Sequence, residues 1–126
     1  MTKKQRIDAF VALGRYLASS DEQLQAAIFA AGQQNPWFTE ANVRLALDAI
    51  SELLTADRLE SWLAPYPFDG DIDKTVGLVL AGNIPLVGFH DILCTLCAGF
   101  NAQIKPSGDD RVLITHVVDK LAEIAP

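Results

Sequence analysis

The chain has 126 residues, of which 50% are hydrophobic and 21% are charged. This composition is typical of one folded globular domain and excludes a disordered segment. Sixteen acidic against ten basic residues give a formal net charge of −6. That balance argues against a nucleic-acid or anionic-membrane partner, since both bind clustered Lys and Arg. We interpret the one basic cluster, Lys3, Lys4 and Arg6, as the solvated start of a first helix.

The start of the chain, its longest apolar stretch and its cysteines indicate the cellular compartment. The residues that follow Met1 are charged and polar, so the start does not resemble a secretory signal. The longest apolar stretch, Leu86 to Phe100, is interrupted by polar residues and reads as a buried helix, so we expect no membrane span. The two cysteines indicate free thiols in a reducing environment. We therefore expect a cytoplasmic protein.

The first half of the chain has the hydrophobic period of helices up to about Leu63. A first helix buries a face that includes Ile7, Phe10, Val11, Gly14 and Leu17. In the next helix, Ser20 is a plausible N-cap and Gly32 a plausible C-terminal signal. Residues 35–38, "NPWF", predict a turn.

Two more helices are expected before the pattern changes. Thr39 caps the clearest amphipathic helix in the sequence, and Thr55 caps one further short helix. The segment "APYPFDGDID" at residues 64–73 then predicts a loop, because it combines two prolines, a glycine and three aspartates. We place the domain boundary there, with a helical lead-in at 1–68 and a second unit at 69–126.

The second unit has an α/β pattern. "TVGLVLAG" at 75–82 and "AQIK" at 102–105 predict strands; a buried apolar helix is expected after the first and an amphipathic helix after the second. Strand, helix, strand, helix with short connections predicts a parallel pair with a right-handed crossover. The apolar first strand is expected to be covered on both faces. Two strands leave open edges, so we expect further strands in a longer parent chain or a second copy to complete the sheet.

Polar turns follow both strands. In an open parallel sheet the ligand binds at the carboxyl ends of the strands, which places Gly82-Asn83-Ile84-Pro85 and Lys105-Pro106-Ser107-Gly108 on the same rim. Asn83 has an amide that can donate to a negative charge, and Lys105 with Ser107 can hold a phosphate or a ribose hydroxyl. Each also has a plain structural interpretation as a turn residue or a solvated side chain.

These residues carry a resemblance. The stretch "AGNIPLVGFHDILCTLCAGFNAQIKPSGDD" resembles the start of the cofactor domain in the aldehyde dehydrogenase superfamily. The helical lead-in, with "WFTEANVRLALDAI" and "LTADRLESWLAPYPF", is similar to the acyl-CoA reductase branch, relatives of the fatty acyl-CoA reductases of bioluminescent bacteria. The resemblance covers nearly the whole chain and is most specific from Thr75 to Ser107. It implies the start of a Rossmann-like NAD(P)-binding domain.

The resemblance also implies roles for individual residues. Asn83 matches the asparagine of the oxyanion hole, where one aimed donor is worth roughly 3–4 kcal/mol. Lys105 matches the lysine that contacts the adenosine ribose or its phosphate, and Ser107 lies in the same cofactor loop. The family usually has Glu where this chain has Gly108. Because that acid would repel a 2′-phosphate, we expect NADPH as cofactor, with NADH also possible.

The implied reaction is reduction of an acyl-CoA, or another activated acyl group, to the aldehyde through an acyl-cysteine intermediate. The family's nucleophilic cysteine lies well downstream of the Lys-Pro-Ser loop, so we expect this chain to be the N-terminal part of the enzyme and inactive alone. The alternative is a non-catalytic α/β domain that self-associates through its open sheet edge, as a homo-oligomer.

The remaining reactive residues have structural interpretations. Cys94 and Cys97 are expected to be buried structural thiols, and no metal site is expected. His90 is interpreted as a polar group bonded near the start of its helix, and His116 as a surface or satisfied residue. The aromatic residues Trp37, Trp62 and Phe68 are expected to be packing anchors between the two halves.

Overall fold

The computed structural model describes residues 1–67 and 69–126, so the expected role of Phe68 lies outside the described residues. The fold is a mixture of helices with one small sheet, in agreement with the α/β expectation. The elements in chain order are α1 (Lys3–Leu17), α2 (Glu22–Gln34), α3 (Glu40–Leu53), α4 (Ala56–Leu63), β1 (Thr75–Val79), α5 (Phe89–Cys97), β2 (Asn101–Lys105), the 3₁₀ turn η1 (Gly108–Asp110) and α6 (Val112–Ile124).

Side chains cap the starts of the first four helices. Thr2 forms a capping box with Gln5 at the start of α1, and Thr39 and Thr55 accept backbone N–H groups at the starts of α3 and α4, as expected. The expected cap Ser20 is wrong by one residue. Asp21 is the N-cap of α2, because its carboxylate accepts the N–H groups of two residues in the first turn.

The expected stop at Gly32 is also wrong, since α2 continues to Gln34. Gly32 instead lies in the last turn of α2. A Cβ at this position would be 3.3 Å from the carbonyl oxygen of Phe38. The glycine therefore permits close packing of the following turn. Gly99, expected near the end of α5, does follow that helix, with a left-handed φ of +94° that favours glycine.

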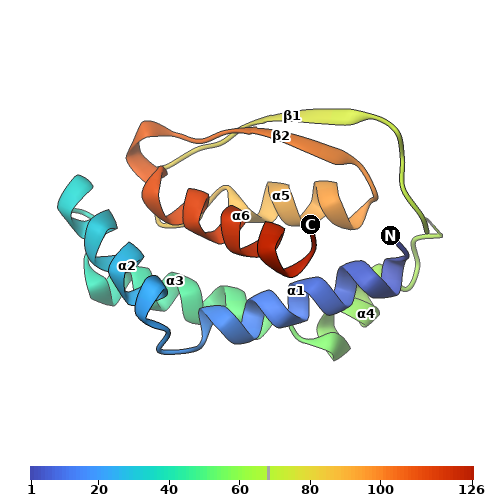
Figure 1. Cartoon of the computed structure of the whole chain (residues 1–126), viewed down its shortest axis with the longest axis horizontal. Coiled ribbons are helices and arrows are strands. Elements are labelled where there is room, and N and C mark those ends of the chain that lie inside the picture. The colour runs from blue at the N-terminus through green and yellow to red at the C-terminus, as the bar shows by residue number, and fades with distance from the viewer. Residues whose placement is uncertain (68) are drawn as a thin grey trace.

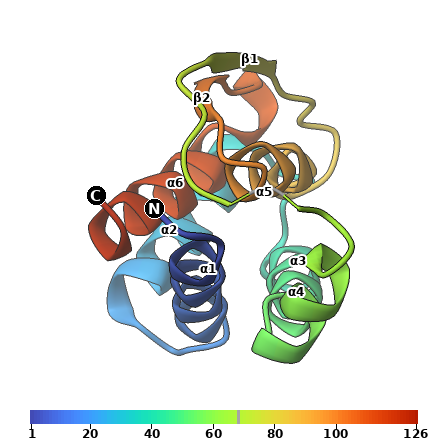
Figure 2. The same cartoon turned by 90° about the vertical axis from the view of Figure 1, so that its right-hand side faces the viewer.

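The elements are stacked in three levels. The sheet lies at one side, α5 and α6 lie beneath it, and α1 to α4 form the opposite side (Figure 1). Viewed along the helices, α5 lies above α1 and α3 (Figure 2). One buried apolar cluster takes side chains from both sides of the expected boundary, such as Leu13 and Leu47 from the helical half and Leu93 and Leu113 from the other half. The division at 68/69 remains a prediction.

The sheet has two parallel strands, as the sequence predicted. Thr75 of β1 is opposite Asn101 of β2, and Val79 is opposite Lys105. The expected cover on both faces is wrong. Exposed and half-buried residues alternate along each strand, because α5 and α6 cover one face only (Figure 1). On the other face Val79 is 83% exposed.

Arg6 joins the two halves of the chain. It is buried, with 6% exposure, and its guanidinium donates to the carbonyl oxygen of Gly70 and, at 2.7 Å, to the carboxylate of Asp71. The solvated cluster expected at the start of α1 is therefore wrong for this residue. Its side chain points back toward the loop that precedes β1, and also lies against Gly99.

The aromatic anchors behave differently. Trp62 of α4 is half-buried and packs its ring beside that of His90 on α5, as expected of an anchor between the halves. Trp37 is 82% exposed and anchors nothing, so its expected role is wrong.

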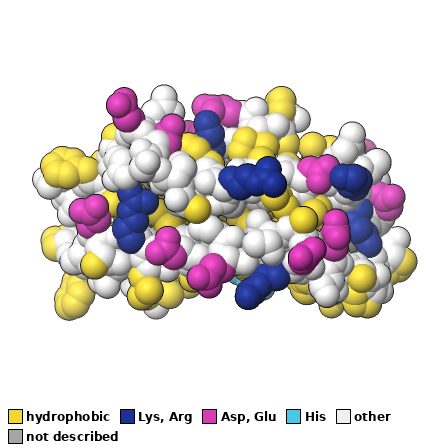
Figure 3. Space-filling model, turned by 90° about the horizontal axis from the view of Figure 1, so that it is seen from below, with side chains coloured by type: hydrophobic (Ala, Val, Ile, Leu, Met, Phe, Trp, Pro, Cys, Tyr) yellow, Lys and Arg dark blue, Asp and Glu magenta, His cyan; other side chains and the backbone are white. Residues whose placement is uncertain are grey.

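Seen from below, the face of the N-terminal helices has acidic, basic and apolar side chains interspersed (Figure 3). Among the described residues, no helix combines the length and apolarity that a bilayer crossing requires.

Candidate functional site

The two polar turns meet in space. A Cβ at Gly82 would lie 2.4 Å from the Ser107 hydroxyl oxygen and 2.5 Å from its Cβ, well inside van der Waals contact. Only glycine leaves room for this approach. Leu80, just after β1, donates its N–H to the carbonyl oxygen of Lys105 at 3.0 Å. The Asn83 turn and the Lys105–Gly108 turn are thus packed together at the carboxyl ends of the strands.

The candidate site residues have different surroundings. Asn83 and Lys105 are exposed, and Lys105 lies beside Val79 at the end of the uncovered sheet face. Ser107 is half-buried, and its hydroxyl accepts the N–H of Asp109 at 3.2 Å as the cap of η1. Ser107 therefore already has a structural task in this turn.

Gly108 begins the 3₁₀ turn and is exposed. A Cβ at this position would meet nothing within 4 Å, and its φ is not in the left-handed region. Its carbonyl oxygen accepts the side-chain amide of Gln34 at 3.3 Å. A side chain could replace Gly108 without a steric cost, so the glycine does not serve packing.

Two hollows flank Asn83. The first is an apolar groove of about 490 Å³ between α3 and the Asn83 turn. Its apolar lining consists of Trp37, Phe38, Leu45, Ala46, Ala49, Ile84 and Pro85. The second is a hollow of about 370 Å³ lined by Asn35, Trp37, Gly82, Asn83 and Asp109. Asn83 thus lies where an apolar and a polar surface adjoin. The volumes of both hollows are within the range of small-molecule sites.

Asp110 is a buried acid that the sequence analysis missed. It is 3% exposed, and its Oδ2 accepts the backbone N–H of Leu86 at 2.7 Å. Burial raises the pKa of this carboxyl to about 6, although the Leu86 bond opposes the rise. Its other oxygen, Oδ1, is buried and has no hydrogen-bond partner among the residues that the structure describes. The pattern Ser-x-x-Asp from Ser107 marks a helix start, and was the signal available in the sequence.

The two cysteines differ from each other. Cys97 is buried as expected, and burial raises the pKa of its thiol to about 12. Cys94 is only half-buried, so the expectation of burial is wrong for it. Its Sγ lies 3.5 Å from Nε2 of His90, one turn earlier on α5. Burial and the nearby Asp91 raise the pKa of the Cys94 thiol, which disfavours the nucleophilic thiolate.

His116 is half-buried and satisfied, which agrees with its interpretation. Its Nε2 lies 2.7 Å from the hydroxyl of Tyr16 and joins α6 to α1. Burial first, and then the charge of Asp21, raise the pKa of Tyr16 to about 12. This contact serves the packing of α6 against α1.

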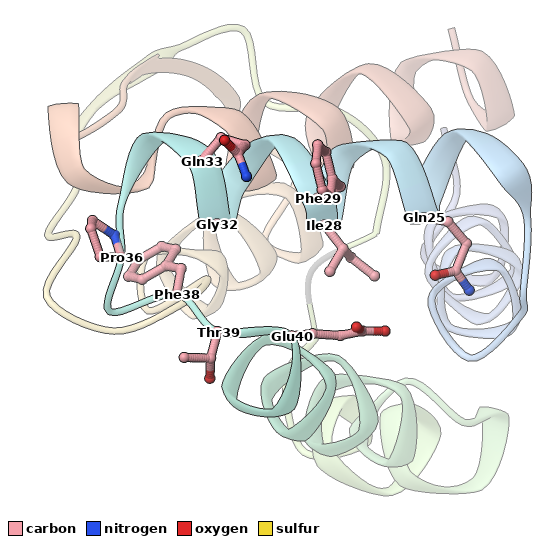
Figure 4. Close-up of a pocket in the computed structure, with 9 residues that line it drawn as sticks. All are labelled: Gln25, Ile28, Phe29, Gly32, Gln33, Pro36, Phe38, Thr39 and Glu40. Carbon is pink, nitrogen blue, oxygen red and sulfur yellow. The ribbon is translucent and has the colours of Figure 1, made fainter.

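A further hollow of about 450 Å³ lies between α2 and the start of α3 (Figure 4). Ile28 and Phe29 come from α2, and Thr39 and Glu40 from the α3 side. It contains none of the candidate residues Asn83, Lys105, Ser107 and Gly108. We therefore assign the candidate site to the junction of the polar turns and not to this hollow.

The comparisons with known proteins give no family. No protein-family model, no curated protein and no solved structure matches the chain. Within residues 1–67 and 69–126, no group of three or more His, Cys, Asp or Glu side chains is placed to hold a metal ion.

Proposed function

We propose that the chain is the N-terminal part of an NAD(P)H-dependent acyl-CoA reductase of the aldehyde dehydrogenase superfamily. In this proposal α5, β1, β2 and α6 belong to the start of a Rossmann-like cofactor domain. The observation that supports it is the contact of Gly82 with Ser107. It brings the two segments that carry the resemblance together at the ligand end of a parallel sheet.

Each residue then has a chemical role. Attack of a cysteine of the parent enzyme on a thioester gives a tetrahedral oxyanion, and the Asn83 amide donates to it. The exposed ammonium of Lys105 pairs with the ribose phosphate of the cofactor, and Ser107 holds the loop in shape. The apolar groove beside Asn83 receives the acyl chain, which needs a neutral, apolar lining.

The cofactor role is tested by calorimetric titration of the chain with NADPH. Lys105→Ala is expected to weaken binding by about tenfold, the worth of one charge-assisted contact. Lys74→Ala is the matched control, because Lys74 is an exposed lysine just before β1, at the opposite end of the sheet. A folded chain that does not bind NADPH, or equal losses in both variants, contradicts the assignment.

Gly108→Glu tests the choice of cofactor. The new side chain has room, since nothing lies within 4 Å of the Cβ position. Its carboxylate would repel a 2′-phosphate and accept the ribose hydroxyls of NADH. We expect the ratio of NADPH to NADH affinity to fall by about tenfold. An unchanged ratio in a variant that still binds NADPH would remove Gly108 from the site.

The acyl groove is tested with Trp37, which lines it. The chain has two tryptophans, so Trp62→Phe leaves Trp37 as the single reporter. Dodecanoyl-CoA is expected to shift its emission to shorter wavelength, because the acyl chain removes the indole from water. Coenzyme A alone is the control and is expected to leave the emission unchanged. An equal response to both would assign the effect to the nucleotide.

The second candidate is a non-catalytic domain that self-associates. The exposed Val79 on the uncovered sheet face favours it, as do the two outer strand edges. Sedimentation equilibrium then gives a dimer that Val79→Lys converts to a monomer, with no response to NADPH. A monomer at all concentrations contradicts this candidate.

A further inference from the structure

The turn that carries Asn83 is held at both ends by one short segment of the chain. At its first end, Gly82 packs against the Ser107 side chain, and a Cβ there would also lie 3.1 Å from the backbone nitrogen of Asp110. At its second end, the N–H of Leu86 donates to the Asp110 carboxylate at 2.7 Å. Residues 83–85 span these two attachment points.

Within residues 1–67 and 69–126, the Asp110 carboxylate is the acceptor that the Leu86 N–H has at the second attachment. Leu86 has a left-handed backbone, with a φ of 59°, and its side chain is buried. A leucine adopts this conformation only where its surroundings compensate for the cost. The charged acceptor supplies that compensation, since a hydrogen bond to a charged group is stronger than a neutral one.

The Asp110 carboxylate is itself fixed. Asp110 lies in η1, where its backbone N–H donates to the carbonyl oxygen of Ser107 at 3.2 Å. The carbonyl oxygens of Gly108 and Asp109 accept the side-chain amides of Gln34 and Asn35 at the end of α2. Thus helix α2 supports η1, and η1 supports the Asn83 turn.

We propose that Asp110 is a positioning residue, which sets the geometry of the Asn83 turn through its hydrogen bond to Leu86. The statement that this turn serves an oxyanion rests on the proposed function; the positioning does not.

Amide hydrogen exchange of the full chain, followed by NMR, tests the proposal without a ligand. In the unchanged protein the Leu86 amide is expected to exchange slowly, although it lies in a turn. Asp110→Ala is expected to accelerate exchange at Leu86 by at least about tenfold, the factor for loss of one bond to a charged acceptor. Core amides of α1 and α3 are expected to keep their rates.

Two further variants isolate the carboxylate. Asp110→Asn retains a side-chain oxygen that can accept the Leu86 N–H without the charge, and is expected to restore part of the protection. Asp109→Ala removes the neighbouring exposed carboxylate, and is expected to leave the Leu86 exchange rate unchanged.

Three outcomes would overturn the proposal. They are rapid exchange at Leu86 in the unchanged protein, a uniform acceleration of every amide in Asp110→Ala, and an equal effect of Asp109→Ala. The exchange rate of Leu86 in the unchanged protein is measured without any variant. The proposal can therefore be contradicted even if Asp110→Ala does not fold. If Leu86 behaves as expected while the chain ignores NADPH and dodecanoyl-CoA, the positioning stands and the proposed function fails.

Discussion

The helices α1 to α4 and the sheet β1–β2 differ in how completely they bury their apolar side chains. Leu47 and Leu59 of the helices are fully buried, whereas Val79 of the sheet is 83% exposed. A helical bundle buries its stripes against itself, but a sheet has two faces and two edges to cover. The helices α1 to α4 therefore bury their apolar stripes in the core that they share with α5 and α6, whereas one whole face of the sheet, with the polar turns at its end, is left accessible.

Leu47→Ala should give the largest loss of stability and sharpens this comparison. Loss of a fully buried leucine costs about 3 kcal/mol, because the neighbouring helices cannot collapse into the cavity. Leu45→Ala is the matched control two residues away on α3, where the side chain is 72% exposed. We expect it to change the free energy of unfolding by less than about 0.5 kcal/mol. Urea unfolding of both variants measures the difference, and similar losses would show that α3 packs in another register.

Arg6→Met tests whether the two regions are joined through one buried cation. The change leaves the Gly70 carbonyl oxygen without the Arg6 donor, and leaves the Asp71 carboxylate with the N-terminal ammonium of Met1 as its remaining charged partner. We expect a loss of about 2 kcal/mol. Lys4→Met removes a solvated lysine of the same helix, whose partner Asp8 lies 3.0 Å away, and should cost less than about 0.5 kcal/mol. Thermal unfolding of Arg6→Met and Lys4→Met measures the two losses. Equal losses would argue against a junction of the two regions through Arg6.

The smallest expected effect concerns pH. The pKa of Asp110 is raised from 3.8 to about 6 in the folded protein, so the fold binds this proton more tightly than the unfolded chain. The contribution of Asp110 to stability is therefore complete below about pH 4 and is lost as the pH rises through 6. Asp110→Asn removes this dependence, while the lowered pKa values of Asp21, Asp69 and Asp71 act equally in both proteins.

The difference in unfolding free energy between Asp110→Asn and the unchanged protein should thus shift in favour of the variant by on the order of 1–2 kcal/mol between pH 4 and pH 7, allowing for solvent screening. Urea midpoints measured across that range test it. Asp109→Asn, in the same turn, should run parallel to the unchanged protein. A parallel profile for Asp110→Asn would mean that the carboxyl is not desolvated.

Local signals in the sequence predicted the elements well. Thr2 to Leu63 has helical period, Thr39 and Thr55 cap their helices, and Gly99 follows α5. These features depend on residues within one or two turns of each other, so the local sequence encodes them. Where two polar residues compete for one cap, as Ser20 and Asp21 do, the sequence could not decide, because the entry angle of the helix selects the acceptor.

The parallel pairing of the strands and the meeting of the two polar turns were also predictable, because a short strand–helix–strand connection permits little else. Asn83 and Ser107 therefore lie at the same end of the sheet, as the sequence predicted. Their roles in catalysis and cofactor binding remain proposals.

The sequence by itself determined the helices, the caps of α3 and α4 and the parallel pairing of the strands, because these follow from contacts within a few residues or from short connections. Only the tertiary structure decided that Arg6 is buried, that Trp37 and Val79 are exposed, and that Asp110 accepts the N–H of Leu86. Each of these depends on which distant segment covers the residue. Burial and long-range hydrogen bonds are properties of the packed chain, which a local pattern of residue types does not contain.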